Sequence, residues 1–120
     1  MHELSVAQSI LEIVQANLPA GEGSSVESIK VKVGQLSGVV PDSLEFCFSA
    51  LVADTPFQGA SLQIEVIPFT LECRTCGEVF VNDTGFVICP HCGGSDSKVL
   101  GGMELQVVEI ELCDRPMEVV

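Results

Sequence analysis

Four cysteines, arranged as two Cys-x-x-Cys pairs, constrain this chain more than any other feature of its sequence. The pairs are Cys73/Cys76 and Cys89/Cys92, and twelve residues separate them. Two residues between paired cysteines let both sulfurs face one ion from a tight turn, and a glycine directly after each pair (Gly77, Gly93) permits the positive φ of such a turn. The pattern predicts a closed tetrahedral zinc site with a structural role, because no position is left for water.

The alternatives to a zinc site are two disulfides, four free thiols or an iron centre on the same ligands. The sequence does not distinguish an iron centre from a zinc site. A thioredoxin-type redox motif is disfavoured because such motifs begin a helix, whereas these pairs lie in a turn-rich stretch. His91 lies between two predicted ligands and is expected to be exposed and not to bind metal. The alternative interpretation is that His91 has a minor role in pH-dependent zinc affinity. Cys47 and Cys113 are interpreted as ordinary buried or half-buried thiols.

The charge of the chain restricts its partners. The 120 residues include 17 acidic and 5 basic side chains, a formal net charge of −12. Nucleic acid and anionic membranes are disfavoured because clustered Lys and Arg are missing, whereas cations or a basic protein suit this charge. No run approaches the roughly 20 apolar residues of a membrane span, and the start of the chain does not resemble a secretory signal, so a cytoplasmic protein is expected.

Hydrophobic periodicity predicts the secondary structure. Apolar residues spaced by three and four predict a helix over 4–18, and a second helix begins at Pro41. Alternation predicts strands over 28–33 and 62–66. The last strand, ending near Leu112, changes phase between Val107 and Val108, which indicates a β-bulge.

These elements predict an α+β fold in which two helices pack on a small mixed sheet of about three strands. The C-terminal strand completes the sheet after a zinc-ribbon-like module loops out. Residues 1–69 and 103–120 form the α+β domain, and residues 70–102 form the zinc-binding module.

The amino terminus, Met1-His2-Glu3, is a second candidate metal site. The α-amine of Met1, the amide nitrogen of His2 and the His2 imidazole can chelate one ion in a plane. Imidazole and deprotonated amide nitrogens in a square plane select Ni(II) or Cu(II). The amide nitrogen or the carboxylate of Glu3 completes the fourth position. Without further context, an N-terminal histidine is only a solvated residue at a frayed terminus.

The chain resembles the HypA/HybF family, the nickel-incorporation accessory proteins of [NiFe]-hydrogenase maturation. The combination of an initial Met-His-Glu with two later Cys-x-x-Cys pairs is specific, since neither half alone would decide the family. Besides the cysteine pairs, the resemblance rests on residues Met1–Glu3, Ser5, Ala7, Ile10, Val31–Gly34, Leu36–Ser37, Pro41–Phe48, Leu62–Glu65 and Ile110–Glu111.

The resemblance implies a nickel-binding domain and a zinc domain. It implies that His2 and the adjoining nitrogens of Met1 bind Ni(II), and that Glu3 contributes to or tunes that site. The implied partners are a HypB-type GTPase, the hydrogenase large-subunit precursor and, in some members, urease accessory proteins. Some relatives carry further histidines near their cysteines, whereas this chain has only His91 there.

The sequence leaves three hypotheses for the function of this chain. The leading hypothesis is a nickel metallochaperone, a monomer or homodimer, with zinc as structural metal and nickel as transient cargo. The second is a zinc-ribbon adaptor without metal delivery, whose activity would not need His2. An enzyme is disfavoured, because a four-cysteine shell has no open coordination position and the chain has no GxxxxGK[ST] loop.

Overall fold

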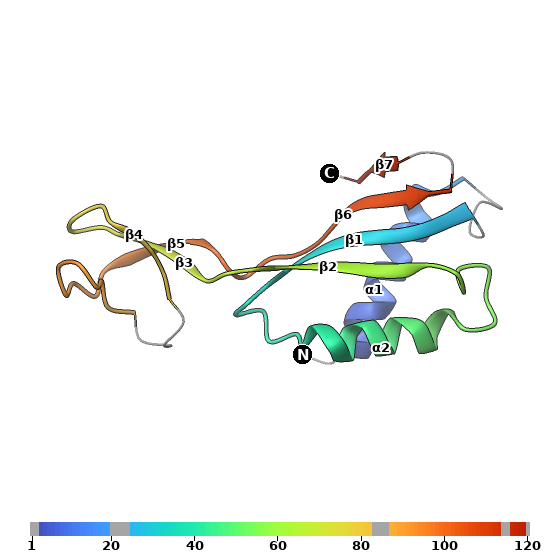
Figure 1. Ribbon diagram of the computed structural model, residues 1–120, viewed down its shortest axis with the longest axis horizontal. Helices are drawn as coiled ribbons and strands as arrows, with labels where there is room; N and C mark the ends of the chain where they lie inside the picture. Colours follow the sequence, from blue (N-terminus) through green and yellow to red (C-terminus); the bar gives the residue numbers. More distant parts are fainter. Residues whose placement is uncertain (1–2, 20–24, 83–86, 114–115, 120) are drawn as a thin grey trace.

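The computed structural model describes residues 3–19, 25–82, 87–113 and 116–119. Its elements, in chain order, are α1 (Glu3–Asn17), β1 (Val26–Gly34), α2 (Pro41–Val52), β2 (Ser61–Ile67), β3 (Thr70–Cys73), β4 (Val79–Val81), β5 (Ser97–Gly101), β6 (Leu105–Leu112) and β7 (Pro116–Glu118). The strands form two sheets, which lie end to end along a molecule of 55 × 26 × 17 Å (Figure 1).

The first sheet has the strand order β2-β1-β6-β7. Strand β1 pairs parallel with β2 and antiparallel with β6, so the sheet is mixed, as predicted. Helix α2 lies between β1 and β2 in the sequence and supplies the crossover that a parallel pair needs. The second sheet, of order β4-β3-β5, is antiparallel throughout.

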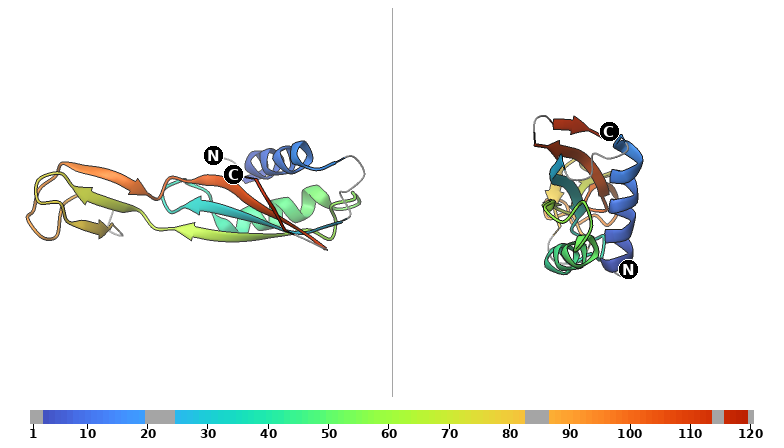
Figure 2. Two further views of the ribbon diagram at one scale, coloured as in Figure 1. Left: turned by 90° about the horizontal axis from the view of Figure 1, so that it is seen from above. Right: turned by 90° about the vertical axis from the view of Figure 1, so that its right-hand side faces the viewer.

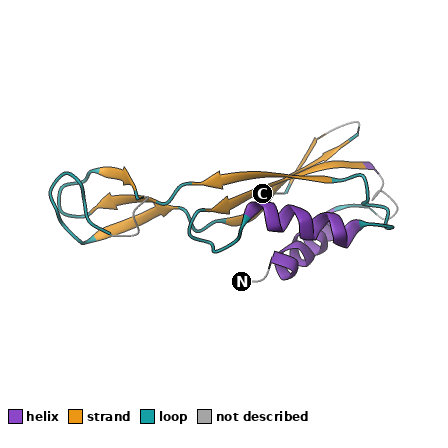
Figure 3. Cartoon of the chain, turned by 60° about the horizontal axis from the view of Figure 1, so that its bottom comes forward, coloured by secondary structure: helices purple, strands orange, loops and turns teal. Residues whose placement is uncertain are grey.

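Both helices lie against the first sheet, and no helix accompanies the second sheet in the part of the chain that the structure describes (Figures 2 and 3). One core holds buried side chains of α1, α2, β1, β2 and β6. Alternate residues of β1 point into this core: Ile29, Val31 and Val33 are at most 1% exposed. Among the described ranges, neither helix has the length and apolar character needed to cross a bilayer.

The predicted α+β fold of two helices on a small mixed sheet is confirmed. The predicted helix over 4–18 is observed over Glu3–Asn17, and the second helix begins at Pro41 as predicted. The bulge is confirmed too: Lys30 pairs with Glu109 and Val31 with Val107, so Val108 is the extra residue of β6.

Two details of the sheet differ from the expectation. Strand β7 is an additional short edge strand of three residues, which pairs with Glu109–Glu111 of β6. Val66, expected on the buried side of β2, is 50% exposed. Strand β2 is an edge strand, and fewer of its side chains are covered than in the central strand β1.

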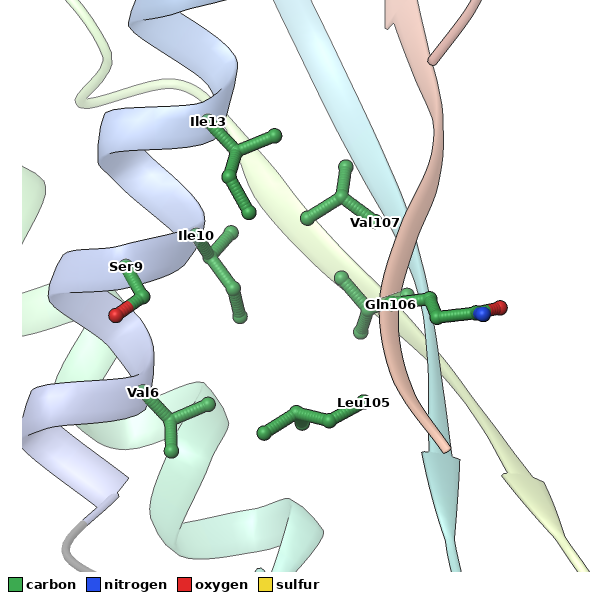
Figure 4. A pocket seen from close by; sticks show the side chains of 8 residues that line it. Val6, Ser9, Ile10, Ile13, Leu105, Gln106 and Val107 are labelled. Carbon is green, nitrogen blue, oxygen red and sulfur yellow. The ribbon is translucent and has the colours of Figure 1, made fainter. Parts of the chain in front are cut away.

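An apolar groove of about 60 Å³ separates α1 from β6. Figure 4 shows Val6, Ile10 and Ile13 of the helix facing Leu105 and Val107 of the strand. Ile13 and Leu105 are 39% and 38% exposed, so they form the rim of the groove. Helix α1 therefore covers the sheet incompletely along this side.

Replacement of Leu44 by alanine tests the core. Leu44 is completely buried in α2, so we expect Leu44→Ala to lower the free energy of unfolding by about 2–5 kcal/mol. Phe46→Ala on the same helix is the matched control, because Phe46 is 75% exposed and its loss should change stability by less than about 0.5 kcal/mol. Denaturant unfolding followed by circular dichroism measures both. Equal effects of the two variants would contradict this packing.

Candidate metal centre

Two similar turns carry the four cysteines. Cys73 ends β3, and Cys89 lies in the segment that precedes β5. In each turn the N–H of the glycine after the second cysteine donates to the carbonyl of the first: Gly77 to Cys73 at 2.8 Å, and Gly93 to Cys89 at 2.9 Å. Gly77 and Gly93 have φ values of 81° and 75°, so the expected positive φ at both glycines is confirmed.

Backbone hydrogen bonds hold the two turns together. The N–H of Arg74 donates to the carbonyl of Asp96 at 2.9 Å, which joins the first turn to the chain after the second. Strand β3 also pairs with β5, in a register that places Cys73 opposite Ser97. The side chains of Arg74 and Asp96 add little, because they approach only to 3.8 Å and both are mostly exposed.

The four sulfurs converge on one point. All four Sγ atoms lie within 4.8 Å of one another, and the Cys73–Cys92 and Cys76–Cys89 pairs are 3.6 Å apart. Each of these contacts joins the two turns, and no disulfide links the described cysteines. A tetrahedral zinc with Zn–S bonds of about 2.3 Å spaces its sulfurs about 3.8 Å apart, so the cluster fits such an ion.

The thiols ionise unequally when no ion neutralises them. Amide N–H groups, chiefly that of Cys76, lower the pKa of Cys73 to about 6. The N–H of Glu78 lowers the pKa of Cys76, but removal from water and contacts with the other sulfurs outweigh it and raise that pKa to about 12. For Cys92, the N–H of Gly94 lowers the pKa, but the contact with Cys73 and removal from water together outweigh it, and the pKa is raised. Four thiolates at this spacing therefore need a cation.

The burial of the cysteines is asymmetric. Cys73 and Cys89 are 1% exposed, whereas Cys76 and Cys92 are on the surface. His91 is exposed, as expected, and the group of converging side chains consists of the four cysteines. The donor set is therefore four sulfurs, the ligand set of structural zinc and of some iron centres.

Gly94 is a site residue that sequence reasoning did not single out. Its N–H lies 3.4 Å from Sγ of Cys92, and a Cβ on it would come within 3.2 Å of the same sulfur and 3.4 Å of Oγ1 of Thr75. The available signal is the doubled glycine after Cys92, which by itself indicates only the exit from the module.

Only part of the predicted N-terminal site lies in the described chain. Met1 and His2 are outside the described residues. Glu3 is the first residue of α1, and its carboxylate accepts a 3.4 Å hydrogen bond from the N–H of Val40, just before α2. Glu3 and the cysteines therefore belong to different parts of the molecule: Glu3 begins a helix on the first sheet, and the cysteines lie at or after the ends of strands of the second.

Removal of one buried sulfur tests the metal centre. We expect Cys89→Ser to lose about one equivalent of bound metal per chain and to destabilise the second sheet, because three thiolates no longer close the shell. Metal analysis after dialysis and amide NMR spectra measure the two effects. Cys113→Ser is the control, since Cys113 is exposed and outside the cluster. Equal metal loss in both variants would refute the four-sulfur site.

Proton release provides a second test of the same site. At pH 7, the raised pKa values of Cys76 and Cys92 keep both thiols protonated without metal, so binding of a dication must release at least these two protons. Affinity should therefore fall as the pH is lowered. Calorimetric titration in buffers of different ionisation enthalpy gives the proton count from its slope. A slope of zero would exclude coordination through these thiols.

The chain is similar to one protein family along nearly its whole length. The family model described as "Hydrogenase/urease nickel incorporation, metallochaperone, hypA" matches residues 1–112. A hydrogenase maturation factor HypA of Geobacter metallireducens is 45% identical over 112 residues, covering 93% of this chain and 99% of the relative. The HypA of Streptomyces avermitilis is 43% identical over 112 residues, covering 92% and 86%.

A solved structure shares the fold. The solution structure of the Ni metallochaperone HypA from Helicobacter pylori superposes with a TM-score of 0.63 at 23% sequence identity, covering 93% of this chain and 97% of that one. At this identity, the likeness concerns the arrangement of helices and strands.

Proposed function

Since this chain belongs to the HypA family of hydrogenase/urease nickel-incorporation metallochaperones, we propose that it binds Ni(II) at its N-terminus and delivers the ion to the [NiFe]-hydrogenase large-subunit precursor. The family resemblance inferred from sequence motifs is thereby confirmed. The observation that carries the proposal is the match over residues 1–112, which includes both Met1-His2-Glu3 and all four cysteines. Urease is the alternative client to which members of the same family deliver nickel.

The nickel site that we propose consists of nitrogen donors of Met1, His2 and Glu3. Helix α1 begins at Glu3, and the first four N–H groups of a helix have no acceptor within it. Coordination by the amide nitrogen of Glu3 therefore breaks no helical hydrogen bond. The Glu3 carboxylate already accepts the N–H of Val40, which favours the amide nitrogen as ligand and the carboxylate as the group that positions the residue.

Zinc is the metal that we propose for the cysteine cluster, with a structural role. The part of the chain around the second sheet has few buried apolar side chains of its own, chiefly Phe69 and Leu71 beside Cys73 and Cys89. So small a core needs another source of stability, and a structural zinc supplies it. We accordingly divide the chain into a nickel-binding domain (residues 1–69 and 103–120) and a zinc-binding module (residues 70–102).

The partners that we propose follow from what the chain lacks and from its charge. The sequence has no GxxxxGK[ST] loop, so GTP hydrolysis during maturation belongs to a HypB-type GTPase, and this chain is a carrier and not an enzyme. The net charge of −12 suits a cationic cargo or a basic partner surface. The cytoplasm is the compartment that we propose, since it keeps thiols reduced.

Nickel titration of the tag-free protein and of His2→Ala tests the function. We expect the unaltered chain to bind one Ni(II) with the absorption of a planar low-spin complex. His2→Ala should weaken binding at least about 100-fold, because loss of a ligand exceeds the effect of losing a supporting residue. Calorimetry and visible absorption measure both, and zinc content is checked on the same samples.

Two controls complete this experiment. His91→Ala removes the other histidine of the chain and should leave nickel binding unchanged. Unchanged zinc content in all samples shows that the cysteine centre is intact. Nickel binding that survives in His2→Ala, or that is absent from the unaltered chain, would reject the N-terminal site and favour a zinc-ribbon adaptor.

A further inference from the structure

Two short connections join the first sheet to the second. Pro68 and Phe69 lead from β2 to β3, and residues 102–104 lead from β5 to β6. The chain is narrow here (Figure 1). Two connections alone would form a hinge, about which the second sheet could swing.

A third segment, Gly34–Leu36, bonds to both connections. This segment ends β1 and begins the turn that leads toward α2. Its backbone N–H groups donate three hydrogen bonds: Gly34 to the carbonyl of Glu104 at 2.7 Å, Gln35 to that of Ile67 at 2.8 Å, and Leu36 to that of Gly102 at 2.7 Å. The side chain of Gln35 adds a fourth, accepting the N–H of Phe69 at 3.0 Å.

Backbone packing at this point leaves no room for side chains on two glycines. A Cβ on Gly34 would lie 2.2 Å from the carbonyl carbon and oxygen of Gly102. A Cβ on Gly102 would lie 2.5 Å from Cα of Phe69, and Gly102 has a φ of 115°, which side chains disfavour. Three chain segments therefore pack against one another, and only glycine permits that approach.

The turn at Gly102 is itself fixed. The carboxylate of Glu104 accepts the N–H of Gly102 at 2.7 Å, and Gly102 is buried. Phe69 is 7% exposed, so each connection has a buried residue where the segment crosses it: Phe69 in one and Gly102 in the other. Neither connection retains the freely rotating backbone that a hinge requires.

We infer that Gly34–Leu36 is a clamp that holds the cysteine-bearing sheet at a fixed orientation to the helix-bearing sheet. The molecule then tumbles as a single rigid body. A partner that contacts both sheets then binds a preorganised surface. No entropy is lost in ordering a hinge on binding, so the affinity for that partner is not reduced by such a cost. This inference does not depend on which metal either site binds.

Residual dipolar couplings of the zinc-loaded, ¹⁵N-labelled protein test the clamp. In the unaltered chain, the amides of β1, β2 and β6 and those of β3 and β5 should fit one alignment tensor. In Gly34→Ala, the added Cβ must displace Gly102, so the two groups should need separate tensors. The rotational correlation time of the second sheet should fall by about half, as expected for a small independent module.

The matched control is Gly59→Ala. A Cβ on Gly59 would have no atom within 4 Å, and Gly59 has no positive φ, so this variant should keep the single tensor. Gln35→Ala is a milder second variant that keeps the fold and removes the acceptor of the Phe69 N–H; rapid hydrogen exchange at Phe69 should follow. Separate tensors in the unaltered chain, or a single tensor in Gly34→Ala, would overturn the inference. If Gly34→Ala fails to fold, the unaltered chain and Gln35→Ala decide.

Discussion

Strand β1 is the element on which the rest of the structure depends. It is the only described strand with a long partner on each side, β2 in parallel and β6 in antiparallel. Ile29, Val31 and Val33 fill the space beneath the helices, and full burial of each such side chain contributes about 1.5–3 kcal/mol. The same strand ends at Gly34, where its backbone meets the connections to the second sheet. One strand thus serves both the core and the junction.

The cysteine-bearing end is stabilised by interactions other than hydrophobic burial. Its described residues form three short strands and no helix, and few of their apolar groups are buried, so hydrophobic burial contributes little there. Its order comes from backbone hydrogen bonds within two similar turns and from four sulfurs that require a cation. The two ends therefore respond to different perturbations: cavity-forming mutations act on the first, and loss of metal acts on the second.

The features predictable from the sequence are those encoded by local pattern. Period-3.6 spacing located the first helix to within one residue, Pro41 marked the start of the second, and the phase change at Val107 and Val108 identified the bulge. Spacing of the cysteines predicted the sulfur cluster and the positive φ at two glycines, because each turn is a short local structure.

The features that sequence reasoning missed depend on contacts between distant segments. Strand β7 has three residues and begins with a proline, too short for any alternation to be visible. Gly34 and Gly102 are in close backbone contact although they lie far apart in the sequence. The residues around each glycine resemble those of an ordinary turn, so the sequence does not indicate this contact. Val66 alternates correctly but lies on an edge strand, where alternation does not guarantee burial.

The order of strands in the first sheet has a consequence for modularity. Strands β2 and β6, between which the cysteine-bearing segment is inserted, lie on opposite sides of β1 and not beside each other. Any chain that joins them directly must pass over the end of β1, a span of two strand spacings, or about 9.6 Å. A loop of a few residues covers that distance, so the topology permits replacement of the whole insertion by another segment without a change of strand pairing. The helix-bearing sheet can therefore accept different segments at this insertion point without a change of its own strand order.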